Sequence, residues 1–494
     1  MKTSSNRKKV VVIGAGFGGL ASAAMLGKHG FEVTVIEKNK QPGGRAMVLK
    51  EKGYQFDMGP SWYTMPDVFE EFFAQFGKKV GDYYKLKRLS PSYRIFFGKD
   101  DYVDMPVSKK EIYKLFDDLE EDGSEKLKKY LSQAEYQYVT AMKGYIKRDY
   151  RTLFDMFDFK MARESAKLHL FENMDKFTKR FFKSERAQKI LQYTLVFLGG
   201  SPKKTPALYA LMSHIDINLG IWYPIGGLGS VVNAIAKLGK QHGVKFKFST
   251  EARSIKIVDG KAAGVETNKG FIEADYIVSN ADYAFTENSL LPLKYQSYKK
   301  EYWEKKTLAP SAFIAYLGMG RKYPKIKHHS LFFHNDWTEH FDSIFDAPGW
   351  PDKPSYYVNK ATETDKGFAP KDSDTLFILV PIASGIKDTK SIRDKYLKKI
   401  IKDMEDVLGD DISNHIKYKK ILSLNDYKSI YNSYKGTALG LSHTLFQTAY
   451  FRPHIKSKKV KNLYYAGQFT HPGIGVPTCI ISGEIAANLI KDDK

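Results

Sequence analysis

Three glycines near the N-terminus have the spacing of a dinucleotide-binding turn. Gly14, Gly16 and Gly19 form a GxGxxG pattern between an apolar run at residues 10–13 and a segment of helical periodicity at residues 17–29. Glycine at these positions permits a tight turn, a close approach of the backbone to a diphosphate, and close packing of the helix on its strand. The pattern predicts a diphosphate site at the N-terminal end of this helix.

A carboxylate follows the second apolar run of the sequence. Glu37 comes directly after residues 32–36, which have the composition of a strand. In a βαβ dinucleotide-binding unit, a carboxylate at this position accepts hydrogen bonds from the ribose hydroxyls. It would repel a 2′-phosphate, so the sequence favours NAD or FAD over a phosphorylated nucleotide.

Residues 41–45, Gln-Pro-Gly-Gly-Arg, decide between these two cofactors. The segment resembles the extension of the fingerprint found in the amine oxidase-like flavoprotein superfamily, which implies FAD. Gly43 and Gly44 would allow a turn beside the diphosphate, and Arg45 would donate charge-assisted hydrogen bonds to it. The alternative is that Arg45 is a solvated surface cation.

A second motif lies near the other end of the sequence. Residues 463–468 have the pattern of a buried strand, and Pro477 suits the first turn of a following helix. In the superfamily that this segment resembles, the N-terminus of that helix faces the flavin pyrimidine ring. A helix N-terminus stabilises negative charge by roughly 0.3–2 kcal/mol. The alternative is an ordinary strand and helix that complete the sheet.

Further segments, spread over nearly the whole chain, resemble the bacterial-type phytoene desaturases and related carotenoid desaturases. The most particular are Trp-Tyr-Pro-x-Gly-Gly at residues 222–227 and Thr-His-Pro-Gly-x-Gly-x-Pro at residues 470–477. Gln468 departs from the superfamily, many members of which carry an acidic residue there. The resemblance implies FAD contacts at Gly14, Ala15, Gly16, Phe17, Gly19, Glu37, Lys38, Gly44, Arg45, Gly59, Pro60, Ser61, Gly467, Gln468 and Val476.

The resemblance implies a reaction that removes two hydrogens from a saturated carbon–carbon bond beside an existing double bond, with FAD as acceptor. We expect phytoene as the lipophilic polyene substrate and a more conjugated polyene such as lycopene as the product. A later-pathway carotenoid desaturase, a carotenoid isomerase or a retinoid saturase on the same scaffold is the alternative. A non-enzymatic carrier is much less favoured, because all three fingerprint glycines, Glu37 and Arg45 are present.

The motifs leave the group that accepts the substrate proton unidentified, so no catalytic residue is predicted. Three histidines are candidates, although a lone histidine is more often structural: His214, His443 and His471. Four aromatic residues in the motifs are expected either to line an apolar channel or to belong to the core: Trp62, Tyr63, Trp222 and Tyr223.

The dinucleotide-binding motifs at residues 14–19 and 37 require a parallel sheet with helices on its faces. The periodicity predicts α/β class: a Rossmann-like, glutathione reductase-like FAD-binding lobe with a discontinuous α+β substrate domain inserted. Residues 109–189 have mainly helical patterns, and residues 274–280 are expected to form a strand at the sheet edge.

The predicted domain boundaries divide the chain into alternating segments. The FAD-binding domain takes residues 1–82, 220–290 and 455–494, and the substrate and membrane-associating domain takes residues 83–219 and 291–454. Two insertions rich in lysine and aromatic residues, at residues 84–158 and 325–371, match no motif of the carotenoid desaturases. They are expected to determine substrate and membrane specificity.

Composition limits the partners. The chain has 494 residues, a net charge of +22 and no uninterrupted apolar run of the roughly 20 residues that span a bilayer. One cysteine, Cys479, excludes an internal disulfide and a multi-cysteine metal site. The basic N-terminus lacks a signal-peptide cleavage pattern. We expect a cytoplasmic protein that associates peripherally with anionic membrane surfaces, binds no nucleic acid, and has no metal site.

Overall fold

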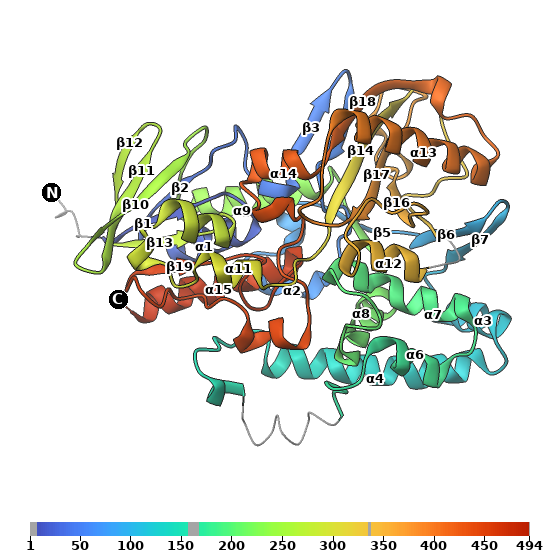
Figure 1. Cartoon of the computed structure of the whole chain (residues 1–494), viewed down its shortest axis with the longest axis horizontal. Helices are drawn as coiled ribbons and strands as arrows, with labels where there is room; N and C mark the ends of the chain where they lie inside the picture. The colour runs from blue at the N-terminus through green and yellow to red at the C-terminus, as the bar shows by residue number, and fades with distance from the viewer. Residues whose placement is uncertain (1–6, 157–166, 334–336, 494) are drawn as a thin grey trace.

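The computed structural model describes residues 7–156, 167–333 and 337–493. Figure 1 shows two main sheets at opposite ends of the long axis, one around β1 and one around β14. The C-terminal helix returns to the sheet around β1, beside the start of the chain. The two ends of the sequence therefore contribute to the same part of the molecule.

The first main sheet has five parallel strands in the order β19-β13-β1-β2-β9. Within β1, Val10 and Val12 enter one hydrophobic core while Val11 and Ile13 enter another. Side chains alternate between the faces of a strand, so a sheet covered on both faces needs a continuous apolar run. The strands are β1 (Lys9–Ile13), β2 (Glu32–Ile36), β9 (Lys245–Lys247), β13 (Tyr276–Ser279) and β19 (Leu463–Tyr465).

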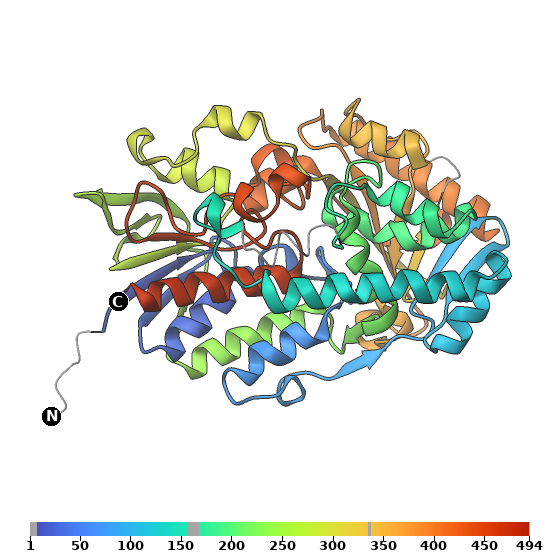
Figure 2. The same cartoon turned by 90° about the horizontal axis from the view of Figure 1, so that it is seen from below.

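Different elements cover the two faces of this sheet. Helices α1 (Phe17–Lys28), α9 (Leu228–Gln241) and α15 (Val476–Asp492) pack on the face of Val10 and Val12, and Figure 2 shows them side by side. The opposite face packs against an antiparallel three-stranded sheet. Its strands are β10 (Ala252–Val258), β11 (Lys261–Thr267) and β12 (Gly270–Glu273).

The second main sheet has seven strands in the order β18-β14-β17-β16-β15-β6-β7. All pairs are antiparallel except β15 with β6. All nine residues of β14 are buried, because both faces of the sheet are covered. The strands are β6 (Tyr93–Gly98), β7 (Asp101–Met105), β14 (Ser311–Met319), β15 (His329–Phe332), β16 (Tyr356–Asn359), β17 (Thr375–Ile382) and β18 (Ile416–Leu422).

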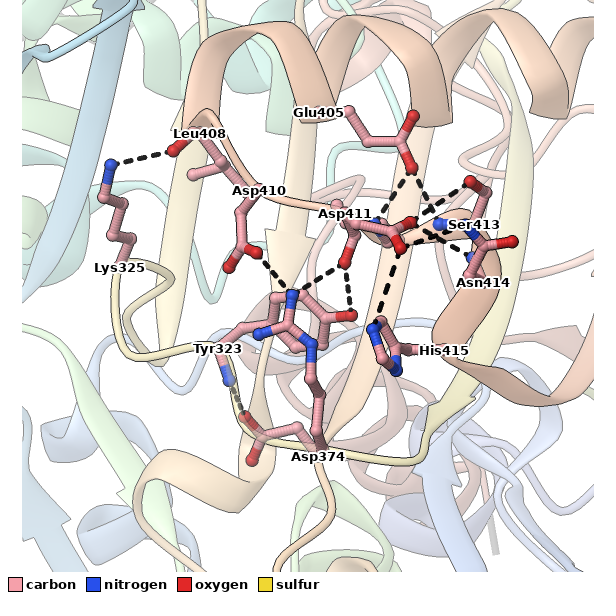
Figure 3. A network of polar contacts seen from close by, with 12 residues as sticks. Tyr323, Lys325, Asp374, Glu405, Leu408, Asp410, Asp411, Ser413, Asn414 and His415 are labelled. Carbon is pink, nitrogen blue, oxygen red and sulfur yellow. Dashed lines mark hydrogen bonds and ion pairs between the residues drawn. The ribbon is translucent and has the colours of Figure 1, made fainter.

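Helix α13 (Lys390–Leu408) covers one face of the second sheet, and a polar network fixes its C-terminal end (Figure 3). The Glu405 carboxylate accepts hydrogen bonds from the backbone N–H groups of Ile412 and Ser413, at 2.9 and 2.7 Å. The hydroxyl of Tyr323 donates to the carbonyl of Asp411, at 2.9 Å. The network satisfies backbone groups at the turn into β18.

A helical layer lies beside the second sheet, and Figure 2 shows its longest helix, α4, running along the molecule. Its members are α3 (Lys109–Leu119), α4 (Gly123–Gly144), α6 (Met174–Phe181), α7 (Glu185–Gln192) and α8 (Leu211–Ser213). The other α-helices and strands of the described chain, leaving aside short 3₁₀ and π-helical turns, are α2 (Pro66–Ala74), α10 (Tyr283–Phe285), α11 (Lys300–Glu304), α12 (Trp337–Phe345), α14 (Leu424–Tyr431), β3 (Val48–Glu51), β4 (Tyr54–Asp57), β5 (Leu86–Arg88) and β8 (Trp222–Pro224).

None of the helices in the described ranges has the length and apolarity required to span a membrane.

The parallel sheet and its helices confirm the predicted α/β class. The edge position expected for residues 274–280 is wrong: β13 lies between β1 and β19, because the C-terminal strand pairs with its outer side. The five parallel strands fall in the predicted FAD-binding segments and the seven strands of the second sheet fall in the other segments. The domain boundaries themselves stay a prediction.

Candidate active site

One large cavity has walls from both main sheets, and its volume is ≈ 660 Å³. One part of the wall is formed by the β1–α1 turn and residues 43–46. Elsewhere the wall is mostly apolar and includes Met142, Leu170, Met212, Leu331, Phe333 and Ile344. A cavity with a polar, glycine-rich region and an apolar region suits a dinucleotide and an apolar substrate together.

The β1–α1 turn has the close packing that its glycines predict. Gly14 has a φ of +94°, and a Cβ on Gly19 would lie 2.1 Å from the carbonyl oxygen of Gly14. Helix α1 begins after Gly16 without a side-chain cap, so its first N–H groups have no side-chain acceptor at this end. Such N–H groups bind a diphosphate.

Glu37 lines the cavity and is 5% exposed. One carboxylate oxygen accepts a hydrogen bond from the Ala15 N–H at 2.9 Å. The other accepts from the backbone and side-chain N–H groups of Asn39, both at 2.8 Å. These bonds hold the carboxylate beside the turn, where its remaining lone pairs are positioned to accept from a ribose diol.

Arg45 lies in a short 3₁₀ turn, Gly44–Ala46, at the cavity wall. One guanidinium nitrogen, Nη2, donates to Ser433 Oγ and to the Thr437 carbonyl, both at 3.3 Å. Its Nε is buried and has no hydrogen-bond partner among the described residues. A buried N–H of a cation without an acceptor costs free energy unless a ligand supplies one. The residues here therefore fit the anionic diphosphate of a dinucleotide.

The C-terminal motif forms the adjoining wall. Gly467, Gln468 and Val476 all line the cavity, and α15 begins after Gly475 with no side-chain cap. The side-chain amide nitrogen of Gln468 is buried and lacks a partner among the described residues. The helix N-terminus and this amide thus both present donors to the cavity, as expected for a site that stabilises negative charge.

Asn280 joins the two motifs, a role that the sequence did not indicate. Its side-chain nitrogen donates to the Ala466 carbonyl at 2.9 Å. A Cβ on Gly16 or Gly467 would lie 2.8 or 2.6 Å from its side-chain atoms. Asn280 follows β13, so the interior position of that strand places its side chain between the two glycine-rich turns.

The cavity brings together most of the predicted FAD contacts. Thirteen of the fifteen residues line it: Gly14, Gly16, Phe17, Glu37, Lys38, Gly44, Arg45, Gly59, Pro60, Ser61, Gly467, Gln468 and Val476. Ala15 and Gly19 are not in its wall; Ala15 orients Glu37, and Gly19 packs against Gly14. Contact of these residues with FAD remains a prediction.

The other candidate residues are divided. His443 and His471 line the cavity, whereas His214 lies outside its wall and stacks on Tyr138. Of the four aromatic candidates, Trp62 is in the cavity wall. The three others lie outside it: Tyr63 and Tyr223 are buried, and Trp222 is half-buried.

The comparisons with known proteins decide the family. The model of the flavin-containing amine oxidoreductases matches residues 17–491. A carotenoid 3,4-desaturase of Haloarcula japonica is 45% identical over 488 residues, 98% of each chain. A zeta-carotene-forming phytoene desaturase of Myxococcus xanthus is 33% identical, over 98% of this chain and 94% of the relative. The chain belongs to the carotenoid desaturases of this flavoprotein family.

Solved structures agree with this family at the level of the fold. An oxidoreductase from Methanosarcina mazei has a TM-score of 0.63 at 17% identity, covering 96% of this chain and 99% of that one. A putrescine oxidase has a TM-score of 0.62 at 14% identity, covering 99% of both. These confirm the Rossmann-like flavoprotein fold of the desaturase.

The desaturase is an FAD-dependent oxidoreductase, as the motifs predicted. When bound, FAD supplies the two-electron acceptor for the reaction. The residues of this chain fit it: the α1 N-terminus and the unpartnered Arg45 Nε suit the diphosphate, and Glu37 suits the ribose.

Proposed function

We propose that the protein desaturates a carotenoid at the C3–C4 bond, near one end of the polyene. The 45% identity to the carotenoid 3,4-desaturase of Haloarcula japonica over almost the full length of both chains carries this proposal. The new double bond would extend an existing conjugated system, so the substrate is already a long polyene. The mostly apolar cavity suits such a molecule, which has few polar groups to recognise.

Desaturation of phytoene, the substrate expected from the sequence, is the second candidate. It is supported by the 33% identity to the Myxococcus xanthus phytoene desaturase and by 32% identity to a phytoene desaturase of Fusarium fujikuroi. Both candidates require the same chemistry. A hydride leaves one carbon for FAD, a proton leaves its neighbour, and the remaining electron pair forms the double bond.

Expression in two pigment hosts separates the candidates. One host accumulates phytoene and the other accumulates lycopene, and the pigments are identified by mass and absorption spectrum. We expect the lycopene host to form a product that lacks two further hydrogens and absorbs at longer wavelength, with phytoene unchanged in the first host. Conversion of phytoene alone would favour the second candidate, and no conversion in either host by flavin-loaded protein would contradict both.

The surface beside the cavity supports the proposed membrane association. We define the mouth surface as Phe154, Phe171 and Phe446, whose exposed fractions are 85%, 86% and 70%. The short helical turns Leu153–Met156 and Ala449–Phe451 contact each other. Sequence neighbours of all three phenylalanines line the cavity: Tyr150, Leu170, Leu445 and Phe451. A polyene dissolved in lipid would enter here if this surface rests on the bilayer.

Two basic side chains beside the mouth surface would face anionic headgroups. Arg151 and Lys167 are exposed and close in sequence to Phe154 and Phe171. Exposed aromatic residues flanked by cations are typical of an interfacial contact. The predicted domain with residues 83–219 and 291–454 contains all of these residues, in agreement with its proposed membrane role.

Changing Phe154 and Phe446 to serine is expected to weaken binding to anionic liposomes. Burial of each phenylalanine in the bilayer contributes about 1.5–3 kcal/mol, so each change should lower the partition coefficient about tenfold or more. Flotation measures this directly. Phe271→Ser is the matched control, because Phe271 is 44% exposed on β12, in the three-stranded sheet and not in the mouth surface. Equal flotation of all variants would contradict the mouth surface.

A further inference from the structure

A buried carboxylate with two tyrosine partners lies in the apolar part of the cavity. Asp216 accepts hydrogen bonds from the hydroxyls of Tyr93 at 2.7 Å and Tyr193 at 3.0 Å, one on each oxygen. Asp216 is 6% exposed, and both Asp216 and Tyr193 line the cavity. Each carboxylate oxygen keeps a further lone pair. The group is therefore held in place but remains able to accept a proton.

Trp62 connects this cluster to the predicted flavin contacts. Its ring centroid lies 5.8 Å from that of Tyr93 and 6.1 Å from that of Tyr193. Trp62 directly follows Gly59, Pro60 and Ser61, which are predicted to touch the flavin and which line the same cavity. Asp216 is thus linked through Trp62 to the part of the cavity wall that is predicted to hold the flavin.

The backbone around Asp216 is also unusual. Residues His214–Leu219 form a π-helical turn directly after α8. Single π-helical turns occur frequently at functional sites, because the extra residue redirects side chains. Tyr93 comes from the start of β6 and Tyr193 from the turn Tyr193–Leu198, so three separate elements converge on one carboxylate.

The three histidines among the described residues of the cavity wall, His340, His443 and His471, are less suited than Asp216 to accept a proton. His340 Nδ1 accepts from the Ser355 N–H and its Nε2 bonds to the Pro381 carbonyl. His443 Nε2 accepts from the Ile474 N–H and its Nδ1 bonds to the Tyr209 hydroxyl at 2.6 Å. His471 alone of these keeps Nδ1 without a partner in the described chain, but burial lowers the pKa of His471 to about 4.

The other carboxylates in the cavity wall are Glu37, Glu251 and Asp282, and all lie toward the predicted dinucleotide site. The oxygens of Glu37 accept three N–H groups. Asp282 accepts from the Tyr434 and Phe285 N–H groups. Glu251 is within 4.0 Å of the ammonium group of Lys38. Of the four carboxylates in the described part of the cavity wall, Asp216 is the one bonded to the aromatic residues that pack on Trp62.

The surroundings of Asp216 give it a suitable affinity for protons. Burial raises the pKa of Asp216 to about 7, while the hydrogen bonds from Tyr93 and Tyr193 lower it. Trp62 also stacks on His329, and burial lowers the pKa of His329 well below its usual value, so that imidazole is neutral. A base with a pKa near the working pH both takes up and releases a proton readily.

We propose that Asp216 accepts the proton that the polyene loses during desaturation, with Tyr93 and Tyr193 positioning its carboxylate. The inference rests on the proposed function. A hydride from one substrate carbon would pass to bound FAD, the two-electron acceptor. The proton on the neighbouring carbon passes to a carboxylate oxygen of Asp216, and the electron pair of that C–H bond forms the new C=C bond. Asp216 then releases the proton before the next turnover.

The same carboxylate assists departure of the hydride. As the hydride leaves, positive charge develops on the substrate and spreads along the conjugated system. An anionic carboxylate fixed in a mostly apolar cavity stabilises this charge more strongly than solvent does. The two tyrosine O–H groups favour the ionised form of Asp216 by donating to it, against the burial that raises its pKa.

The first test replaces Asp216 with asparagine, which has the same shape and can still bond both tyrosines. We expect the turnover rate to fall by about 10²- to 10⁴-fold, the usual contribution of a general base. Flavin content, thermal unfolding and polyene binding should stay at the wild-type level. Glu51→Gln is the matched control, because Glu51 accepts the Tyr418 hydroxyl at 2.9 Å outside the cavity.

The second test uses the pH dependence of turnover in Tyr193→Phe. The base must be ionised to accept a proton, so the wild-type rate should rise with pH through a pKa of about 7. Loss of one donor raises the pKa of Asp216, so the rise should move to higher pH in Tyr193→Phe. A purely structural role of Tyr193 would lower the rate without moving the profile.

The outcomes separate this proposal from the proposed function. If wild-type protein desaturates neither polyene, the proposed function fails. If wild-type protein is active and Asp216→Asn keeps its rate and pH profile, the proton acceptor is not Asp216. If His471→Gln loses the rate while Asp216→Asn keeps it, the proton goes to His471 and the inference is overturned. An alkaline shift in Tyr193→Phe together with loss of turnover in Asp216→Asn supports it.

Discussion

Gly19→Val protein is expected to purify without flavin. A Cβ at this position would lie 2.1 Å from the Gly14 carbonyl oxygen and 3.1 Å from the Asn280 side chain. Real atoms do not approach so closely, so α1 would have to move away from β1. That movement displaces the N–H groups at the α1 N-terminus, which we propose bind the FAD diphosphate.

We expect the flavin bound per chain in Gly19→Val to fall by more than about tenfold, since loss of even one charge-assisted bond costs roughly 1.5–3 kcal/mol. The ratio of flavin absorbance to protein absorbance measures this. Gly81→Ala is the control, because a Cβ on Gly81 meets no heavy atom within 4 Å. Full flavin content in Gly19→Val would contradict the placement of FAD at this turn.

Arg452→Ala is expected to destabilise the fold strongly. Arg452 is 2% exposed, and its guanidinium donates to four backbone carbonyls and to no carboxylate within the described chain. The carbonyls belong to Leu441, Gln447, Gln468 and Thr470, and the bonds measure 2.7–3.3 Å. One side chain therefore holds together the loops that carry the C-terminal motif.

Removal of this guanidinium leaves buried carbonyl groups unsatisfied. We expect the free energy of unfolding to fall by about 3–5 kcal/mol, because each such group costs roughly 1–3 kcal/mol and some will find water. Urea denaturation of flavin-loaded protein measures the loss. Arg452→Lys should be intermediate, since lysine keeps the charge and three donors. Arg253→Ala, an exposed arginine on β10, is the control; an equal effect there would refute the role of Arg452.

The sequence predicts best those parts of the fold whose partners are close along the chain. The βαβ unit agrees within a residue: β1 ends at Ile13, α1 spans Phe17–Lys28 and β2 ends at Ile36. The apolar periodicity and the glycines that specify this unit all lie within about 30 residues of one another. The predicted place of Pro477 in the first turn of a helix agrees with α15, which begins at Val476, because Pro477 is a local signal.

The seven-stranded sheet could not be predicted in this way. Its strands β6 and β15 pair through Arg94 with Ser330 and Ile95 with Leu331, across almost half the sequence. No local period specifies that pairing, and the insertion at residues 325–371 had no recognisable relative. The same limit explains the wrong edge position for β13, whose outer neighbour β19 begins only at Leu463.

The same distinction between local and distant signals holds for the residues of the candidate site. Thirteen of the fifteen residues that the motifs predict to contact FAD line the cavity, and Arg45 and Gln468 are among them. The sequence does not indicate Asp216 as a proton acceptor. Its tyrosine partners lie 123 and 23 residues away along the chain, and the three residues form no motif. A buried carboxylate becomes recognisable only when its hydrogen-bond donors and the cavity are visible together.

The strand order β19-β13-β1-β2-β9 also constrains when the protein can mature. β1 leaves the ribosome early, but its neighbour β13 and the outer strand β19 are made much later, β19 roughly 20–90 s after β1 at bacterial-like rates of about 5–20 residues per second. Until then the nascent chain has unpaired strand edges, which promote aggregation. Because Gly467 and the start of α15 complete the cavity wall, the flavin site can form only after both of these segments have been made.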